Sequence, residues 1–264
     1  MSLAGKKERL ASSPEVFARE LLARLKLRSA GELTALLDRL GLAVKEIDSD
    51  GFEGVVVCRA DRRKGIIGIQ RGIPEEGRKR FIICHEIGHF ILPGHGVDGC
   101  VCKSEDIESW RKGAPEYEIE ANAFASELLL PYKELAPLIQ RKKATIALAK
   151  EIAKSFGSSL TASCLKSVEV TDEQCAFIYS VDQSVKWFRR NETFWHYIRG
   201  GKLASESLAA QLFNGATREQ DGAVPAEAWL DSERLPPNAT IWEDSIFLPH
   251  YNSAITILTV HKPF

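Results

Sequence analysis

The stretch FIICHEIGHFIL at residues 81–92 is an almost continuous run of apolar side chains interrupted by three polar ones. A helix drawn through it is apolar on nearly every side, which is the pattern of a buried helix. The turn residues Pro-Gly at 93–94 end it. The polar residues are His85, Glu86 and His89, and burying them costs free energy unless each finds a partner. The sequence therefore predicts a buried helix that carries a polar site.

The spacing of the two histidines points to a metal ion. His85 and His89 are four residues apart, so both imidazoles lie on one face of the predicted helix, with Cβ atoms about 5–6 Å apart. That spacing suits two ligands of one Zn²⁺. Glu86 lies beside the metal, where it can take a proton from a zinc-activated water, as in the HExxH arrangement of zinc peptidases. The alternative is a buried His–Glu–His cluster that bonds to backbone and water.

A catalytic zinc needs a third protein ligand and an open fourth position. His95 is one candidate, because it follows His89 by six residues, which is the spacing of the third ligand in metzincin peptidases. That pattern requires a glycine three residues after the second histidine, and Leu92 occupies this position here. His95 therefore stays open as a ligand, and the alternative is a loop histidine near the mouth of the site.

A carboxylate from a second helix is the other candidate. The sequence EYEIEANAFASELLL follows Pro115 and ends before Pro131, so it predicts a helix with one apolar face. Glu118 and Asn122 are four residues apart and border that face, while Glu120 lies on the wetter side and is the fallback. We predict that Glu118 is the third ligand and that Asn122 orients a ligating histidine. Alternatively, these glutamates are solvated residues that favour the helix dipole.

The segments around these two helices alternate between helical and extended patterns. Before residue 70 we expect two helices, opened by Ser13-Pro14 and ended by Gly41, and a small antiparallel sheet, and we expect a loop at residues 93–114. After residue 140 we expect helical segments followed by strands. The expected strands are Leu42–Ile47, Val55–Cys58, Ile66–Ile69, Cys175–Val181, Val185–Phe188, Thr240–Leu248 and Ile255–Val260, and the later helical segments are 144–156, 159–168, 192–199 and 203–213.

The composition is that of an ordinary globular protein. The chain has 264 residues, 44% of them apolar, with 35 Lys and Arg residues against 36 Asp and Glu residues and a net charge of −1. This balance argues against a mainly electrostatic nucleic-acid binder. No apolar run reaches the roughly 18 residues of a membrane-spanning helix, and the first residues lack the apolar run of a secretory signal. With six scattered cysteines, these features predict a cytoplasmic protein with reduced thiols and no membrane partner.

Two motifs together resemble the ImmA/IrrE-type zinc metallopeptidases. The first is FIICHEIGH at residues 81–89, and the second is EIEANAFASELLLP at residues 118–131, which follows the pattern ExEANxFAxELLxP. The close match covers roughly residues 66–132. The resemblance implies a gluzincin-like site with His85, His89 and a glutamate as ligands and Glu86 as base. It also implies a cytoplasmic endopeptidase of narrow specificity, since members of that family cleave helix-turn-helix repressors in mobile-element induction or in the response to DNA damage.

The order of the segments also resembles the longer IrrE-like members of that family. We predict an α+β fold with a zinc metallopeptidase-like domain at residues 1–140, a helical, helix-turn-helix-like connector at 141–170 and an α+β, GAF-like sensor or regulatory domain at 171–264. The expected recognition helix within residues 146–166 has a single basic side chain, Lys166, although phosphate contacts need more. A helical hairpin that packs or docks a partner is therefore favoured over DNA binding there.

These observations predict a Zn²⁺-dependent metalloendopeptidase whose protein substrate is a helix-turn-helix repressor. An oxyanion donor is also required, and His95 and Tyr117 are the candidates. The aromatic residues of the last hundred, Trp195 among them, are expected in the core, and the alternative is that Trp195-His196-Tyr197 lines a pocket. Cys100 and Cys102 are expected to be loop thiols. The alternative function is a zinc-containing transcriptional regulator without proteolytic activity, which acts by binding DNA or a repressor. A purely structural zinc site, with its fourth position occupied, is the third possibility.

Overall fold

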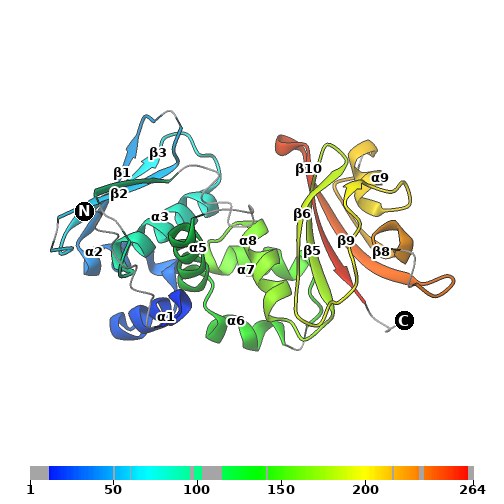
Figure 1. Ribbon diagram of the computed structural model, residues 1–264, viewed down its shortest axis with the longest axis horizontal. Coiled ribbons are helices and arrows are strands. Elements are labelled where there is room, and N and C mark those ends of the chain that lie inside the picture. The colour runs from blue at the N-terminus through cyan, green and yellow to red at the C-terminus, as the bar shows by residue number, and fades with distance from the viewer. Residues whose placement is uncertain are drawn as a thin grey trace, which may run out of the picture. The chain divides into compact units, whose positions relative to one another are not determined.

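The computed structural model divides into two compact units, which are considered one at a time (Figure 1). The first comprises Met1–Glu134 and Lys154–Ser159, and the second comprises Leu135–Ala153 and Leu160–Phe264. This division concerns compactness, so the predicted roles of residues 1–140, 141–170 and 171–264 stay predictions. The structure describes residues 12–49, 51–59, 61–95, the backbone of 98–102, 115–140, 142–215, 217–231 and 235–260.

The first unit is a mixed sheet with helices packed against it. Its predicted helices and first three strands are confirmed, with ends that shift by a residue or so. The elements are α1 (Pro14–Leu25), the short turn η1 (Ala30–Glu32), α2 (Leu33–Leu40), β1 (Leu42–Ile47), β2 (Gly54–Cys58), β3 (Gly65–Gln70), α3 (Glu76–Ile91), β4 (Asp98–Cys102), α5 (Glu116–Leu129) and α6 (Tyr132–Ile139), which runs into the second unit.

The prediction that this sheet is antiparallel is wrong for one of its pairs. The strand order is β1-β3-β2-β4, and β1 runs parallel to β3, whereas the other two pairs are antiparallel. Strand β3 therefore lies between β1 and β2. The order of the strands along the chain does not predict this arrangement. Gly68 lets β3 fit between its two neighbours, because a Cβ atom at this position would lie 2.7 Å from Ile47 Cδ1 and 2.9 Å from Val55 Cγ1.

A short strand stands where the sequence predicts a loop. Strand β4 pairs with β2 at the edge of the sheet, with an irregularity in the pairing between Val56 and Val57. Its sequence, DGCVC, has only three apolar residues in a row and does not alternate, so it is too short a pattern to predict a strand. The side chains of Cys100 and Cys102, and residues 103–114 of the predicted loop, lie outside the described residues.

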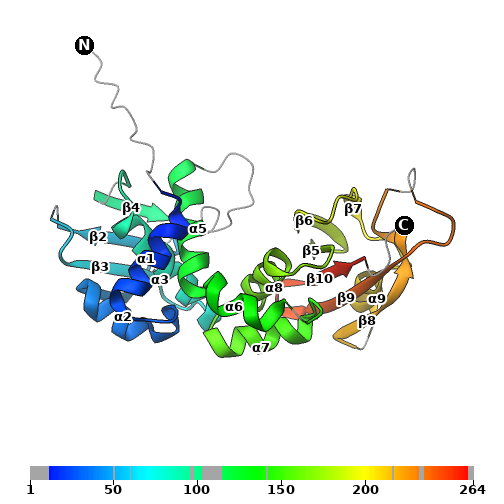
Figure 2. The same cartoon turned by 90° about the horizontal axis from the view of Figure 1, so that it is seen from below.

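The buried helix α3 is the centre of the first unit. It lies against β2 and β3 on one side and against α5 on the other, and α1 runs alongside α5 (Figure 2). Residues Ile82–Phe90 of α3 are all buried, which confirms the prediction from its apolar pattern. Helix α2 ends at Gly41, whose φ of 68° and backbone N–H bonds to Asp38 and Leu37 form the expected left-handed cap.

The second unit is a six-stranded antiparallel sheet with helices on both faces. The strand order is β7-β6-β5-β10-β9-β8. The overall fold is thus α+β, as predicted, while the GAF-like character of this unit stays a prediction. Its elements are α7 (Ile146–Phe156, which runs into the first unit), α8 (Leu160–Val170), β5 (Cys175–Val181), β6 (Ser184–Arg190), β7 (Gly201–Lys202), α9 (Leu208–Asn214), β8 (Glu219–Pro225), η2 (Ala226–Ala228), β9 (Thr240–Leu248), η4 (Pro249–Tyr251) and β10 (Ser253–Thr259).

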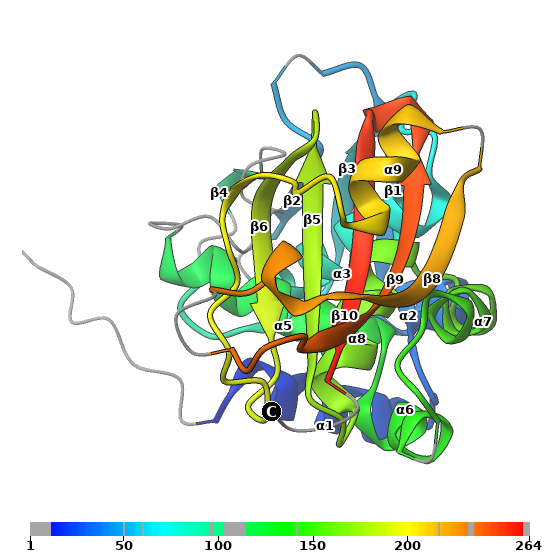
Figure 3. The ribbon, with the colours of Figure 1, turned by 90° about the vertical axis from the view of Figure 1, so that its right-hand side faces the viewer.

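The two faces of this sheet carry separate apolar cores. Helices α7 and α8 cover one face, where Ala149 and Cys164 pack with Phe177. Helix α9 covers the other face, where Trp229 is buried (Figure 3). Strands β5, β9 and β10 alternate their side chains between the two cores. This alternation explains why β5 and β10 have few polar residues in the sequence, whereas β9 carries polar residues at 243–245.

The helix predicted at residues 192–199 is wrong, because this segment is a loop. The side chain of Asn191 holds it: Oδ1 accepts hydrogen bonds from the backbone N–H groups of Cys175 and Phe194, and Nδ2 donates to the carbonyl of Glu173. Local bonds of this kind compete with helix formation. Trp195, expected in the core, is 64% exposed.

Two simple features concern the whole described part of the chain. No helix there has both the length and the apolar character needed to cross a bilayer. Cys58, Cys84, Cys164 and Cys175 are free thiols, which agrees with the prediction of reduced cysteines.

Candidate metal centre

Helix α3 carries three polar residues into the interior of the first unit. His85, Glu86 and His89 are all fully buried. Glu86 faces β2 at its first residue, Gly54. A Cβ atom at position 54 would lie 2.5 Å from Glu86 Oε1 and 2.7 Å from Ile82 Cγ2, so only glycine leaves room for the carboxylate there. The sequence analysis did not identify this requirement, because a glycine at the start of a strand has many ordinary explanations.

Close packing of α3 on α5 brings a second set of polar residues to the histidines. A Cβ atom at Gly88 would lie 3.3 Å from both Ala121 Cα and Phe124 Cδ1, which is tighter than most Cβ contacts in proteins. Gly88 and Ala121 therefore let the two helices approach with almost nothing between them. Glu118 lies one turn before Ala121, and this approach places its carboxylate against the imidazoles of α3.

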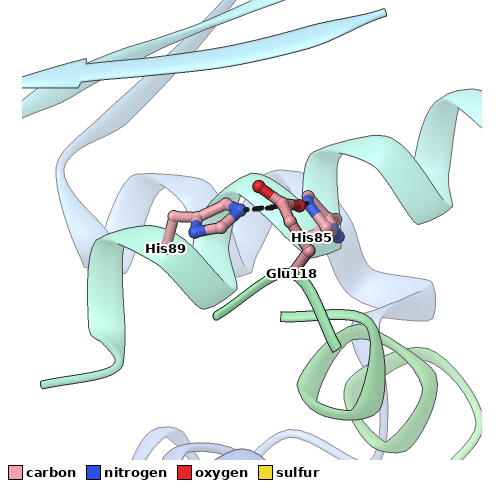
Figure 4. A group of neighbouring side chains, drawn as sticks. All are labelled: His85, His89 and Glu118. Atoms are coloured by element: carbon pink, nitrogen blue, oxygen red, sulfur yellow. Dashed lines mark hydrogen bonds and ion pairs between the residues drawn. The ribbon is translucent and has the colours of Figure 1, made fainter. Parts of the chain in front are cut away.

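Three ligand atoms converge at this point (Figure 4). Glu118 Oε2 lies 3.0 Å from His85 Nε2 and 3.5 Å from His89 Nε2. The two Nε2 atoms lie 3.0 Å from each other. Atoms bound to one zinc ion at 2.0–2.1 Å with a tetrahedral angle lie about 3.3 Å apart. The three observed separations fall on either side of that value, so one ion could reach all three atoms.

Asn122 fixes the tautomer of His85. Asn122 Oδ1 lies 3.0 Å from His85 Nδ1 and can only accept a hydrogen bond, so Nδ1 donates. In a neutral imidazole Nε2 then carries a lone pair, which points at His89 and Glu118. The contact agrees with the place of Asn122 on the helix face, and its role in orienting a metal ligand stays a prediction.

His95 contacts His89 on the side away from the three converging atoms. Its Nδ1 lies 2.9 Å from His89 Nδ1, and its Nε2 lies 2.9 Å from Glu120 Oε2. The structure thus places the two other candidate ligands, His95 and Glu120, behind His89 and not beside its Nε2. Burial is the main cause of a lowered pKa of His95, which favours the neutral ring.

The carboxylate of Glu118 is ionised in this setting. Burial alone would raise its pKa, but when the facing ring nitrogens carry protons, their hydrogen bonds and charges at His85 and His89 outweigh burial and lower the pKa to about 2. A bound cation would take the place of those protons. The site therefore presents an anionic oxygen and two ring nitrogens at one point. Acceptor atoms that converge in this way are held together by a cation, and the set of two imidazoles and one carboxylate is a donor set that zinc takes.

The His85–His89–Glu118 group is the only cluster of three or more such ligand atoms within the described residues. All three members are buried. The geometry fits a metal ion but does not identify the metal, and the assignment of Glu118 as its third ligand stays a proposal. The ring of Tyr117 lies 6.1 Å from that of His89, and its predicted part in oxyanion binding stays a prediction.

The helix-turn-helix-like segment has the predicted elements. Helices α7 and α8 are separated at Gly157, whose φ is 67°. Lys166, the only basic side chain of the expected recognition helix, is 4% exposed, and its Nζ donates to Glu169 Oε1 at 2.8 Å. A buried and paired ammonium group is poorly placed to contact phosphates.

Comparisons with known proteins identify a family for the part of the chain that carries this site. Residues 37–167 match the model of a protein family described as IrrE N-terminal-like domain (Peptidase_M78), which confirms the resemblance seen in the two motifs. No curated protein matches the sequence. Among solved structures, a Mycobacterium tuberculosis transcriptional regulator has a similar fold, with a TM-score of 0.59 and 16% identity over 93% of this chain and 76% of that chain.

Proposed function

The chain carries an IrrE N-terminal-like domain of the Peptidase_M78 family at residues 37–167, and from this premise we propose that it is a zinc-dependent endopeptidase of narrow specificity. One observation carries the proposal: two imidazole Nε2 atoms and a carboxylate oxygen meet within 3.5 Å of one another, next to a buried glutamate. His85, His89 and Glu118 would hold the ion. A bound Zn²⁺ would polarise the scissile carbonyl and make a nearby water more acidic.

Glu86 supplies the proton transfers in this proposal. It is a helix neighbour of His85 and lies outside the group of three ligand atoms. Its carboxylate takes a proton from the attacking water while the water oxygen bonds to the carbonyl carbon. It then gives that proton to the amine nitrogen as the carbon–nitrogen bond breaks. Burial keeps bulk water from competing for the carboxylate, and Gly54 gives it the space that it occupies.

We propose a protein substrate, specifically a helix-turn-helix repressor in the cytoplasm, cleaved in a segment with an extended backbone. The resemblance to ImmA/IrrE-type peptidases supports this choice. The solved structure with a similar fold is described as a transcriptional regulator, and the likeness spans 93% of this chain. Under this proposal the second unit is a sensor or regulatory domain that controls cleavage in a stress response.

The test compares the wild-type chain with Glu86→Gln. Both are loaded with Zn²⁺ and mixed with purified candidate helix-turn-helix repressors. We expect Glu86→Gln to keep one zinc ion and to lose cleavage by at least about 100-fold, because it cannot accept the proton of water. His85→Ala is the matched variant, and it should lose both zinc and cleavage. Undiminished cleavage by Glu86→Gln would remove the proposed mechanism.

The same mixture tests the alternative function. A stable complex with an intact repressor would support a regulator that acts by binding. A salt-sensitive shift of DNA would support DNA binding through residues 146–166. The buried position of Lys166 favours neither phosphate contact nor a recognition helix there. A zinc ion that resists chelators and supports folding without any cleavage would support a structural site.

A further inference from the structure

We propose that His95 and Glu120 form a hydrogen-bonded chain that fixes the orientation and tautomer of His89 and so sets the affinity of the site for its metal ion. The inference rests on the proposed function, since it concerns the same site. It gives His95 and Glu120 a positioning role in place of the ligand role considered for them from the sequence.

The chain of contacts runs from solvent to the metal ligand. Glu120 lies in the first turns of α5 and is partly exposed, with 26% of its side chain accessible. Its Oε2 lies 2.9 Å from Nε2 of His95, which is buried just beyond the end of α3. The other ring nitrogen of His95 lies 2.9 Å from Nδ1 of His89. One imidazole thus bridges a carboxylate and the ligand.

The direction of each hydrogen bond follows from the groups themselves. A carboxylate only accepts, so His95 Nε2 donates to Glu120. The neutral ring of His95 then has its lone pair on Nδ1, which accepts from His89 Nδ1. His89 Nε2 is left with a lone pair, which points toward Glu118 and His85. Without the acceptor at His95, nothing in this chain of contacts keeps the proton of His89 on Nδ1.

The backbone around His95 is held by Arg62, from the turn between β2 and β3. The guanidinium donates to the carbonyls of Phe90 at 3.0 Å and Leu92 at 3.1 Å, and it also donates to the carbonyl of His95. The first two carbonyls belong to the C-terminal end of α3, where the helix dipole favours a cation. This contact anchors the turn at Pro93–Gly94, so His95 is presented to His89 from a fixed backbone.

The two ligating histidines are therefore supported in different ways. His85 donates directly to Asn122 Oδ1, whereas His89 donates to a second imidazole that is itself held by a carboxylate. Partners of this kind, which contact a ligand and not the metal, typically change metal affinity by about 10–100-fold when they are lost. We expect an effect of that size at His95.

The experiment measures Zn²⁺ affinity of the full chain by competition with a chelator. His95→Phe keeps a ring but offers no acceptor, and it should weaken zinc binding by about 10–100-fold. His95→Asn places an amide oxygen near the position of Nδ1, as Asn122 does for His85, and it should restore most of the loss. Glu120→Leu should weaken binding less than His95→Phe. The control is Glu76→Gln at the exposed start of α3, which should leave affinity unchanged.

Absorption of the Co²⁺-loaded chain separates positioning from ligation. The spectrum of His95→Phe should keep the wild-type coordination pattern, because no ligand is lost. Zinc affinity equal to wild type in His95→Phe, no recovery in His95→Asn, or a spectrum showing one ligand fewer would each overturn the inference. A wild-type chain that binds zinc but cleaves no repressor would end the proposed function alone, whereas a wild-type chain that binds no zinc would end both.

Discussion

Two buried carboxylates, Glu118 in the first compact unit and Glu243 in the second, have different surroundings. Glu118 in the first unit is 2% exposed and faces the Nε2 atoms of His85 and His89, which could bind an ion together with it. Glu243 in the second unit is 0% exposed and faces only groups that donate hydrogen bonds. The first arrangement needs a cation to complete it, while the second is complete as it stands. Glu118 therefore belongs to a site that can bind an ion, whereas Glu243 has a structural role, which we call the clamp.

The clamp at Glu243 joins a helix to the sheet. Its two oxygens accept from the backbone N–H groups of Leu208 at 3.0 Å and Ala209 at 2.6 Å, from Trp229 Nε1 at 2.6 Å and from Ser245 Oγ at 2.8 Å. The carboxylate thereby caps the first turn of α9 and ties it to β9. Burial raises the pKa of Glu243, and these hydrogen bonds offset part of that rise.

The largest effect is expected where the clamp is removed. Glu243→Ala leaves three buried donors without an acceptor, at Leu208, Ala209 and Trp229, since Ser245 can still bond to Thr256. At about 1–3 kcal/mol for each buried donor, the free energy of unfolding of the second unit should fall by on the order of 5 kcal/mol. Urea unfolding followed by tryptophan fluorescence measures this. Glu227→Ala, an exposed glutamate in η2, is the control, and an equal loss there would remove the contrast.

Zinc should stabilise the unit that contains Glu118. With free Zn²⁺ at about a thousandfold excess over its Kd, the free energy of unfolding should rise by about 4 kcal/mol. The gain should vanish in Glu118→Ala, which lacks one of three proposed ligands, and should persist in Glu243→Ala. Thermal unfolding with and without zinc measures both. A gain that survives Glu118→Ala, or that disappears with Glu243→Ala, would break the comparison.

Glu86 is another buried carboxylate, and its position depends on the space that Gly54 leaves for it. It therefore differs from both Glu118 and Glu243. Gly54→Ala puts a methyl group 2.5 Å from the original place of Glu86 Oε1, so the carboxylate must move. A displacement of about 1 Å can cost about 100-fold in rate, so kcat/KM for repressor cleavage should fall by that order. Zinc affinity should stay close to wild type, because Glu86 is not among the converging atoms. A loss of zinc together with cleavage would assign Glu86 to the metal.

The smallest effect is expected at the contact between the two helices of the first unit. Gly88→Ala gains up to about 1 kcal/mol of helix propensity but overpacks against Ala121, at a cost of about 1–3 kcal/mol. The net loss of stability should be about 1 kcal/mol, with weaker zinc binding because Glu118 moves away. Gly222→Ala in β8, where the nearest atom would be 3.8 Å away, is the control. A variant that binds zinc as tightly as wild type would show that the contact does not set the site.

Local patterns predicted the parts of the site that depend on helix periodicity. The buried helix α3, the helix α5 and the contact of Asn122 with His85 follow from spacing and apolar faces alone. Other features depend on which segments meet in space. No periodic sequence pattern predicts three of these features: the parallel pairing of β1 with β3, the strand β4, and the space that Gly54 leaves for Glu86. The contact between His95 and Glu120 joins a turn to a distant helix, so residue spacing could name both residues without pairing them.

The near contact of Gly88 with Ala121 has a consequence for how an ion would be taken up. Because backbone meets backbone there, the distance between the two helices is set by the protein itself, before any ion arrives. The ligand-bearing helices are then already ordered in the folded protein, so ion binding does not have to order them and loses little conformational entropy. Loading should accordingly leave amide hydrogen exchange in both helices nearly unchanged, and the rate of capture should be governed by access and dehydration of the ion.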